Sequence, residues 1–349
     1  TTDEVSADKT DFITVEDAKS MGYIIPDNYT SYDDNRFKSA TGEYAVPRLN
    51  FDNVDKLMKA AHENGVKLRG HTLVWHQQTP KYFFQQNYKI TTGQKYNTSK
   101  ECMDTRLEFY VKTVMNHVLS SEYADCLYSY DVVNEYLHSA NAEKDSKNIT
   151  YWGLIYGTYD KSVKDHGVTL RPSYVKDAFK YAHEMLVKYD RLDVKLIYND
   201  YNCYQNPENI IHLVDYINSD GKVCDGIGMQ SHLDITDSFH SATNYAKALE
   251  YFRLNCPDLE IQITELDATM VSTEDKPLTD EDQAAYYDQI MNAILTNKKN
   301  GGNITALIIW SLYDGVSWRP AKFPCLFNGL YMPKAAFYAV IDAKKQYWD

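Results

Sequence analysis

Apolar and polar residues follow one recurring pattern along most of the chain. From about residue 50, a short apolar run typical of a buried strand is followed by a segment with the 3.6-residue period of a helix. After residue 206, for example, Ile210, Val214 and Ile217 fall on one helical face. The pattern predicts strands at residues 66–75, 127–134, 194–201, 226–233, 259–266 and 304–312.

Amphipathic helices alternate with these strands. We expect helices at residues 52–64, 101–120, 173–189, 207–219, 241–254, 279–299 and 333–347. Strict alternation of strand and helix indicates a parallel sheet. The even spacing, and the absence of a GxGxxG nucleotide-binding loop, favour a closed barrel over a doubly wound sheet. The sequence therefore predicts an α/β protein with a closed β/α barrel, forming a single domain over residues 1–349.

The first fifty residues depart from this pattern. Residues 12–15 form a weak candidate for a seventh strand, and the polar, turn-rich stretch 16–50 predicts a long loop. Too few residues precede that stretch for a complete strand and crossover helix. We therefore expect the first β/α unit of the barrel to be missing or atypical in this chain.

Composition argues against some classes of function but does not identify one. The chain has 349 residues, 44% of them apolar, which is enough for a large core. A net charge of −13 argues against nucleic acid as a partner. No apolar run is long enough to span a membrane, and six scattered cysteines without a CxxC pair argue against a metal site. We expect no cofactor.

Aromatic residues are frequent, with 30 tyrosines in the chain. Flat aromatic faces stack on sugar rings, although a tyrosine-rich core and surface would give the same composition.

Polar side chains occur where the predicted strands end, which is where barrel enzymes carry their catalytic groups. Two of them, Glu135 and Glu265, follow long apolar runs in strands 130 residues apart in sequence. Hydrolysis of a glycosidic bond requires two carboxyl groups across the scissile bond. The competing interpretation is that each glutamate pairs with a nearby arginine or lysine, and it becomes less favoured when both glutamates and the adjacent Asn134 are taken together.

At this point the chain resembles glycoside hydrolase family 10. The matching segments occur in the family's order and cover about residues 50–347. They are GHTLVWH at 70–76, DVVNE at 131–135, NDYN at 199–202, GMQSHL at 228–233, ITELD at 263–267 and WSLYD at 310–314, running on to Ser317 and Trp318.

This resemblance implies a (β/α)8 TIM barrel that forms one catalytic domain. It also implies a retaining endo-β-1,4-xylanase acting on xylan and xylo-oligosaccharides. It implies Glu135 as general acid/base and Glu265 as nucleophile, with the two carboxyl groups about 5–5.5 Å apart. Glu135 must start protonated, so its surroundings should raise its pKa. Glu265 must be ionised, so hydrogen-bond donors should surround it.

The family's supporting residues map onto further positions of this sequence. The resemblance implies that Asn134 binds the sugar 2-hydroxyl, that His232 contacts the nucleophile, and that Asp267 fixes the tautomer of His232. Gln230 is expected near the acid/base. The remaining sugar-site residues implied by the resemblance are His71, Trp75, Gln78, Asn199, Tyr201, Trp310 and Trp318.

The N-terminal region departs from the family. A family strand ending in T-x-E-N-x-M-K, whose Asn and Lys bind sugar, has only a partial counterpart at residues 14–19, with Asp17 in place of Asn. Lys19 is the candidate for the sugar-binding lysine. Three explanations stay open. The first unit was lost, it lies beyond an insertion, or residues 1–50 rebuild that side of the barrel in another way.

Two alternatives to a xylanase remain. A β-1,4-glucanase on the same barrel would carry the same motifs, because specificity rests on a few pocket contacts. A non-catalytic barrel that binds xylan would account for the incomplete N-terminus, although the intact Glu135, Glu265 and His232 argue against it. We expect a secreted, extracellular monomer, either alone or as part of a multimodular enzyme.

Overall fold

The computed structural model describes residues 12–29, 46–89, 97–139, 150–164, 166–271 and 277–348. These residues form two compact units. The first comprises Thr1–Tyr198 and Tyr216–Cys224, and the second comprises Asn199–Asp215 and Asp225–Asp349. No helix within the described ranges has both the length and the apolar character needed to cross a membrane.

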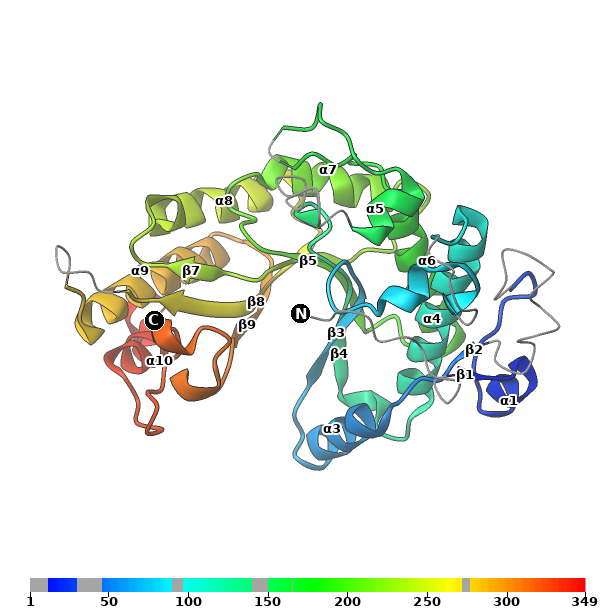
Figure 1. Cartoon of the computed structure of the whole chain (residues 1–349). Helices are drawn as coiled ribbons and strands as arrows, with labels where there is room; N and C mark the ends of the chain where they lie inside the picture. Colours follow the sequence, from blue (N-terminus) through cyan, green and yellow to red (C-terminus); the bar gives the residue numbers. More distant parts are fainter. Residues whose placement is uncertain are drawn as a thin grey trace. The chain divides into compact units, whose positions relative to one another are not determined.

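Parallel strands form the centre of the first unit (Figure 1). Strand β3 (Leu68–Trp75) pairs in parallel with β4 (Leu127–Asn134), and β4 lies next to the start of β5 (Lys195–Asp200). Almost every residue of β4 is buried. Burial on both faces explains why this strand is a nearly continuous apolar run in the sequence.

Helices cross over between these strands. Helix α3 (Asp52–Glu63) precedes β3, α4 (Lys100–Ser120) links β3 to β4, and α6 (Ser173–Lys188) leads into β5. Helices α4 and α6 pack against each other. The short helix α5 (Tyr151–Tyr156), which the sequence pattern did not predict, begins where the Thr150 hydroxyl accepts a hydrogen bond from the Gly153 amide.

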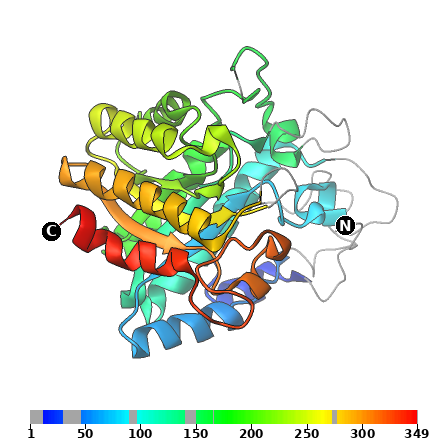
Figure 2. The same ribbon diagram turned by 90° about the vertical axis from the view of Figure 1, so that its left-hand side faces the viewer.

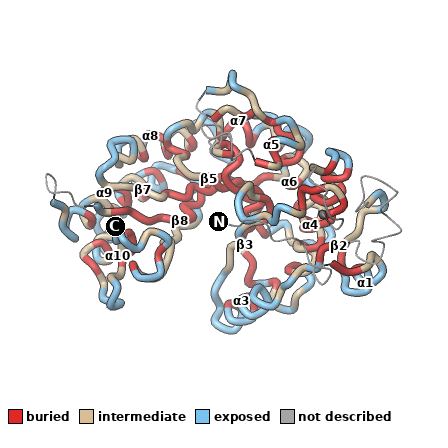
Figure 3. The backbone as a smooth tube through the Cα atoms, in the orientation of Figure 1, coloured by how far each residue is buried: buried red, intermediate tan, exposed pale blue. Residues whose placement is uncertain are grey.

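The second unit continues the same alternation. Strand β8 (Glu260–Thr269) pairs in parallel with β6 (Gly226–Met229), β7 (His232–Asp234) and β9 (Ile304–Ile309). Its helices are α7 (Pro207–Ile217), which ends in residues assigned to the first unit, α8 (Ala242–Asn255), α9 (Asp280–Lys299) and α10 (Ala335–Tyr347). Helix α9 packs against both α8 and α10 (Figure 2). Strand β8 is buried along nearly all of its length (Figure 3).

Short 3-10 turns complete the described elements. They occupy Lys81–Phe84, Gln86–Lys89, Ala124–Cys126, Ser238–His240, Asp314–Val316 and Pro320–Lys322.

The strand predicted at 226–233 is wrong as a single element, because it is two strands. Strand β6 ends at Met229 and β7 begins at His232. Between them Ser231 adopts a left-handed backbone with φ of 65°, which interrupts an extended chain. The Ser231 hydroxyl holds this break by hydrogen bonding to the Tyr245 hydroxyl at 2.8 Å.

The N-terminal segment also differs from the prediction. The predicted strand at 12–15 is only β1 (Phe12–Ile13), which pairs antiparallel with β2 (Val46–Pro47). The predicted loop 16–50 contains helix α1 (Val15–Ser20) and strand β2, while its middle part, residues 30–45, lies outside the described residues. A six-residue helix is too short to show a helical period, so its signal is the Thr14 N-cap, whose hydroxyl accepts the Asp17 amide at 3.0 Å.

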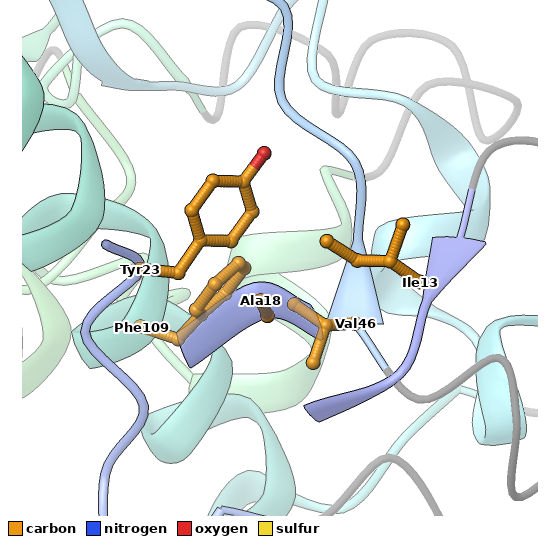
Figure 4. Close-up of a cluster of buried hydrophobic side chains, with 5 residues drawn as sticks. All are labelled: Ile13, Ala18, Tyr23, Val46 and Phe109. Carbon is orange, nitrogen blue, oxygen red and sulfur yellow. The ribbon is translucent and has the colours of Figure 1, made fainter. Parts of the chain in front are cut away.

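This segment packs onto α4 through a small apolar cluster. Ile13, Ala18, Tyr23 and Val46 surround Phe109 of α4, and each of these side chains is buried (Figure 4). The first β/α unit is therefore atypical in the described residues, since its short strand is antiparallel and its short helix docks on α4.

Candidate active site

The side chain of Glu265 lies near the middle of β8 and is held by two neighbours. Glu265 is 5% exposed. The Asn199 amide nitrogen donates to Glu265 Oε1 at 2.8 Å, and His232 Nε2 lies 3.0 Å from Oε2. Thr264 Oγ1 donates to Asn199 Oδ1 at 2.7 Å, which orients the amide so that its nitrogen faces the carboxylate. Both carboxylate oxygens of Glu265 therefore have a hydrogen-bond partner.

His232 bridges two carboxylates. Its Nδ1 lies 2.9 Å from Oδ1 of the fully buried Asp267, and its Nε2 faces Glu265. Burial alone would lower the pKa of His232, but the hydrogen bonds that its ring donates to Asp267 and Glu265 outweigh burial and raise the pKa to about 8. The imidazolium form, which donates from both nitrogens, is thus favoured at neutral pH.

Asp267 also binds one of the two tryptophans that contact His232. Trp318 Nε1 donates to the second oxygen of Asp267 at 2.9 Å, and its ring lies edge-on to His232 with centroids 4.8 Å apart. The ring of Trp310 meets His232 in a similar way at 6.1 Å. The Arg319 guanidinium covers the Trp318 ring at 3.9 Å, although that indole is still 56% exposed. An exposed, oriented indole offers a flat surface to a ligand.

Backbone hydrogen bonds fix the residues that flank this cluster. The Glu265 amide donates to the Gln230 carbonyl at 2.9 Å, and the Gln230 amide donates to the Asp200 carbonyl at 2.9 Å. The Tyr201 amide donates to Asp200 Oδ1 at 2.8 Å. Gln230 is buried and Tyr201 is half-buried. The structure thus brings Asn199, Tyr201, Gln230, His232, Glu265, Asp267, Trp310 and Trp318 into the second unit.

Glu135 lies in the first unit, directly after β4. It is 8% exposed and follows Asn134, which is 2% exposed. Trp75, the last residue of β3, donates its indole N–H to Glu135 Oε2 at 2.8 Å. The backbone φ of Glu135 is 57°, a left-handed conformation that is uncommon for a residue with a side chain.

His71 is oriented by a buried carboxylate in the same unit. Its Nδ1 lies 2.9 Å from Oδ2 of Asp131, which is fully buried in β4. Arg69 forms hydrogen bonds to both oxygens of Asp131. Arg69 and Asp131 were given no role from the sequence, although a carboxylate inside an apolar strand is a signal that a buried partner must exist.

The remaining predicted residues of the first unit lie at the surface. Gln78 is exposed, with a left-handed φ of 60°. Lys19 is exposed in the last turn of α1, rather than at the end of a strand as in the family pattern. Sugar binding by these two residues, like the meeting of Glu135 and Glu265 across one groove, stays a prediction. No group of three potential metal-ligating side chains occurs in the described part of the chain.

Comparison with known proteins gives consistent matches. The chain is 40% identical over 332 residues to endo-1,4-beta-xylanase A of Butyrivibrio fibrisolvens, covering 95% of this chain and 70% of the relative. Among solved structures, it resembles an intracellular xylanase from Thermoanaerobacterium saccharolyticum with a TM-score of 0.66 and 30% identity, covering 84% of this chain and 81% of that chain.

A second solved structure contains the CBM22-1 and GH10 modules of a Clostridium thermocellum endo-1,4-beta-D-xylanase in complex with xylohexaose. It matches with a TM-score of 0.69 and 28% identity, covering 91% of this chain and 57% of that chain. These likenesses, with the parallel β/α alternation inside each unit, confirm the predicted (β/α)8 barrel. The model of the family "Glycosyl hydrolase family 10" matches residues 6–343, and the chain belongs to this family.

Proposed function

We propose that this protein is a retaining endo-β-1,4-xylanase that hydrolyses internal bonds of xylan. The observation that supports this most strongly is the environment of Glu265, a buried carboxylate with Asn199 on one oxygen and His232 on the other. Donors on both oxygens favour the charged form that a nucleophile requires. Membership of glycosyl hydrolase family 10 and the xylanase relatives support the substrate and the retaining outcome.

In the proposed reaction, Glu135 donates its proton to the glycosidic oxygen while a Glu265 oxygen attacks the anomeric carbon. The bond to the leaving sugar breaks and a covalent glycosyl-enzyme forms. Glu135, now ionised, removes a proton from water, which attacks the anomeric carbon and releases Glu265. This double displacement requires the two carboxyl groups to be about 5–5.5 Å apart.

The other residues are proposed to bind and orient the sugar. Asn134 hydrogen-bonds the 2-hydroxyl, a contact that strengthens in the transition state. Trp310 and Trp318 line the site beside the sugar that is attacked, and their edge contacts with His232 support this placement. Gln230 is proposed to lie near the acid/base. The side chains proposed to bind the remaining sugars are His71, Trp75, Gln78, Asn199, Tyr201 and Lys19.

Substrate choice gives the first test. The protein should release reducing ends from xylan and act much more slowly on carboxymethyl-cellulose. Glu265→Ala should abolish xylan turnover while leaving the circular dichroism spectrum unchanged, because it removes the attacking group. Preference for the cellulose derivative would instead favour a glucanase, and xylan binding without turnover by the wild type would favour a non-catalytic barrel.

The acid/base role of Glu135 predicts a dependence on the leaving group. Glu135→Ala should slow xylan hydrolysis by about 10²–10⁴-fold. An aryl xyloside with an activated phenolate leaving group should be attacked at nearly the wild-type rate, because this leaving group needs no proton. The values of kcat/KM on the two substrates, which report the glycosylation step, measure the difference. The kcat on the aryl xyloside should fall, because Glu135 is also the base that activates water for the second step. Unchanged xylan turnover in the variant would show that another group supplies the proton.

The bridging of two carboxylates by His232 predicts a pH-dependent stability. Its pKa is about 8 in the folded protein, against an ordinary value of 6.5 for histidine. Its contribution of about 2 kcal/mol should therefore be complete below pH 6.5 and lost as the pH rises through 8. Urea unfolding at pH 6 and pH 9 should show that His232→Gln destabilises the protein strongly only at the lower pH.

His240 provides a control of opposite sign for this experiment. Burial lowers its pKa, and its Nδ1 accepts a hydrogen bond from the Asp234 amide at 2.8 Å. His240→Gln should therefore destabilise the protein more at pH 9 than at pH 6. An equal effect of His232→Gln at both pH values would mean that the bridging histidine is neutral.

We further propose that the protein is secreted, monomeric and joined to other modules in its parent polypeptide. The Clostridium thermocellum relative, which carries a CBM22-1 module beside its GH10 module, supports a multimodular arrangement. The size of xylan, a polymer of the plant cell wall, supports an extracellular site of action. Immunodetection in the culture medium and in the cells of the source organism measures secretion, and a signal confined to the cells would contradict it.

A further inference from the structure

Three aromatic side chains from separate segments pack together, and one of them belongs to the residue that follows Glu135. Trp152 of α5 stacks on Tyr174 in the first turn of α6, with ring centroids 4.9 Å apart and planes at 10°. Tyr136, the residue after Glu135, meets Tyr174 edge-on at 5.9 Å. All three side chains are buried. We call Tyr136, Trp152 and Tyr174 the aromatic platform.

The aromatic platform is hydrogen-bonded to the residue that contacts the carboxyl group of Glu135. Trp152 Nε1 donates to the Trp75 carbonyl oxygen at 3.2 Å. That oxygen also accepts the Thr79 hydroxyl at 2.8 Å, so both of its lone pairs are used. The Trp75 indole in turn donates to Glu135 Oε2 at 2.8 Å. The backbone of Trp75 is therefore fixed from α5, and its side chain fixes Glu135.

Two tyrosines, Tyr136 of the aromatic platform and Tyr198 of β5, also hold the backbone that follows Glu135. The Tyr136 hydroxyl donates to the Thr169 carbonyl at 2.7 Å, and the Leu137 amide donates to the Tyr198 hydroxyl at 3.1 Å. A left-handed backbone such as that of Glu135 persists only where its surroundings impose it. Tyr136 and its contacts supply that constraint on one side, and Trp75 supplies it on the other.

We propose that Trp152 is a positioning residue for proton transfer by Glu135, acting through the Trp75 carbonyl. This inference rests on the proposed acid/base role of Glu135. A general acid must lie within hydrogen-bond reach of the oxygen that it protonates, and small displacements at a reacting centre cost large factors in rate. The step affected is the transfer of the Glu135 proton to the glycosidic oxygen as the bond to the leaving sugar breaks.

The test substitutes Trp152 by Phe, which keeps a packed ring and removes the N–H donor. The value of kcat/KM on xylan should fall by about tenfold, as part of the contribution that general acid catalysis makes. On an aryl xyloside with an activated phenolate, kcat/KM should stay within about twofold of the wild type, because that leaving group needs no acid. Trp152→Leu, which also loses the ring, should widen this difference.

Tyr156→Phe is the matched control. Tyr156 packs on Trp152 with centroids 6.1 Å apart, but its hydroxyl donates to Asp104 of α4 at 2.8 Å and not toward Glu135. Losing this part-buried hydrogen bond should slightly lower the urea concentration at the midpoint of unfolding. It should change the rates on xylan and on the aryl xyloside by the same small factor.

A second variant keeps the proposal testable if Trp152→Phe folds poorly. Thr79→Val removes the other donor to the Trp75 carbonyl without changing the side-chain volume much, and it should reproduce the dependence on the leaving group. Equal losses on both substrates, or wild-type rates on both, in the variants that fold would overturn the positioning role. Failure of the proposed function is distinguishable, because Glu135→Ala would then also lack any leaving-group dependence.

Discussion

The need to keep a buried carboxylate charged determines how the second unit is built. Removing an ionised group from water costs several kcal/mol unless hydrogen-bond donors replace the lost solvent. Glu265 obtains its donors from two other strands, through Asn199 near the end of β5 and His232 at the start of β7. The left-handed turn at Ser231 starts a new strand in which His232 lies opposite Asp267. The interrupted strand and the charged site are therefore parts of one arrangement.

The first unit also buries carboxyl groups, and different donors contact them. Glu135 accepts the indole N–H of Trp75, and the buried Asp131 has the guanidinium of Arg69 together with His71. Glu265, by contrast, faces a histidine whose pKa is about 8. A positive charge beside Glu265 matches its proposed role, because the nucleophile must stay ionised.

The sequence could predict those features that depend on local pattern. The buried strands appear as apolar runs, and the carboxyl end of β4 places Glu135 where polar groups are expected. Glu265 also follows an apolar run, but β8 continues past it to Thr269, so this glutamate lies inside the strand. Features that depend on a single backbone angle or on a distant contact could not be predicted. Ser231 carries no glycine signal for its left-handed turn, and α1 is shorter than two helical turns. Trp152 becomes connected to Glu135 only through packing between separate segments.

In the proposed mechanism, Glu265 becomes covalently attached to the sugar during turnover. The most direct measurement incubates the protein with a xylobioside that carries fluorine at C2 and a dinitrophenolate leaving group, and then identifies the modified peptide by mass spectrometry. The proposal predicts one added fluoroxylobiosyl group per chain, carried by Glu265, with loss of activity in proportion. Labelling at another residue, or turnover that inverts the anomeric configuration without a covalent adduct, would contradict it.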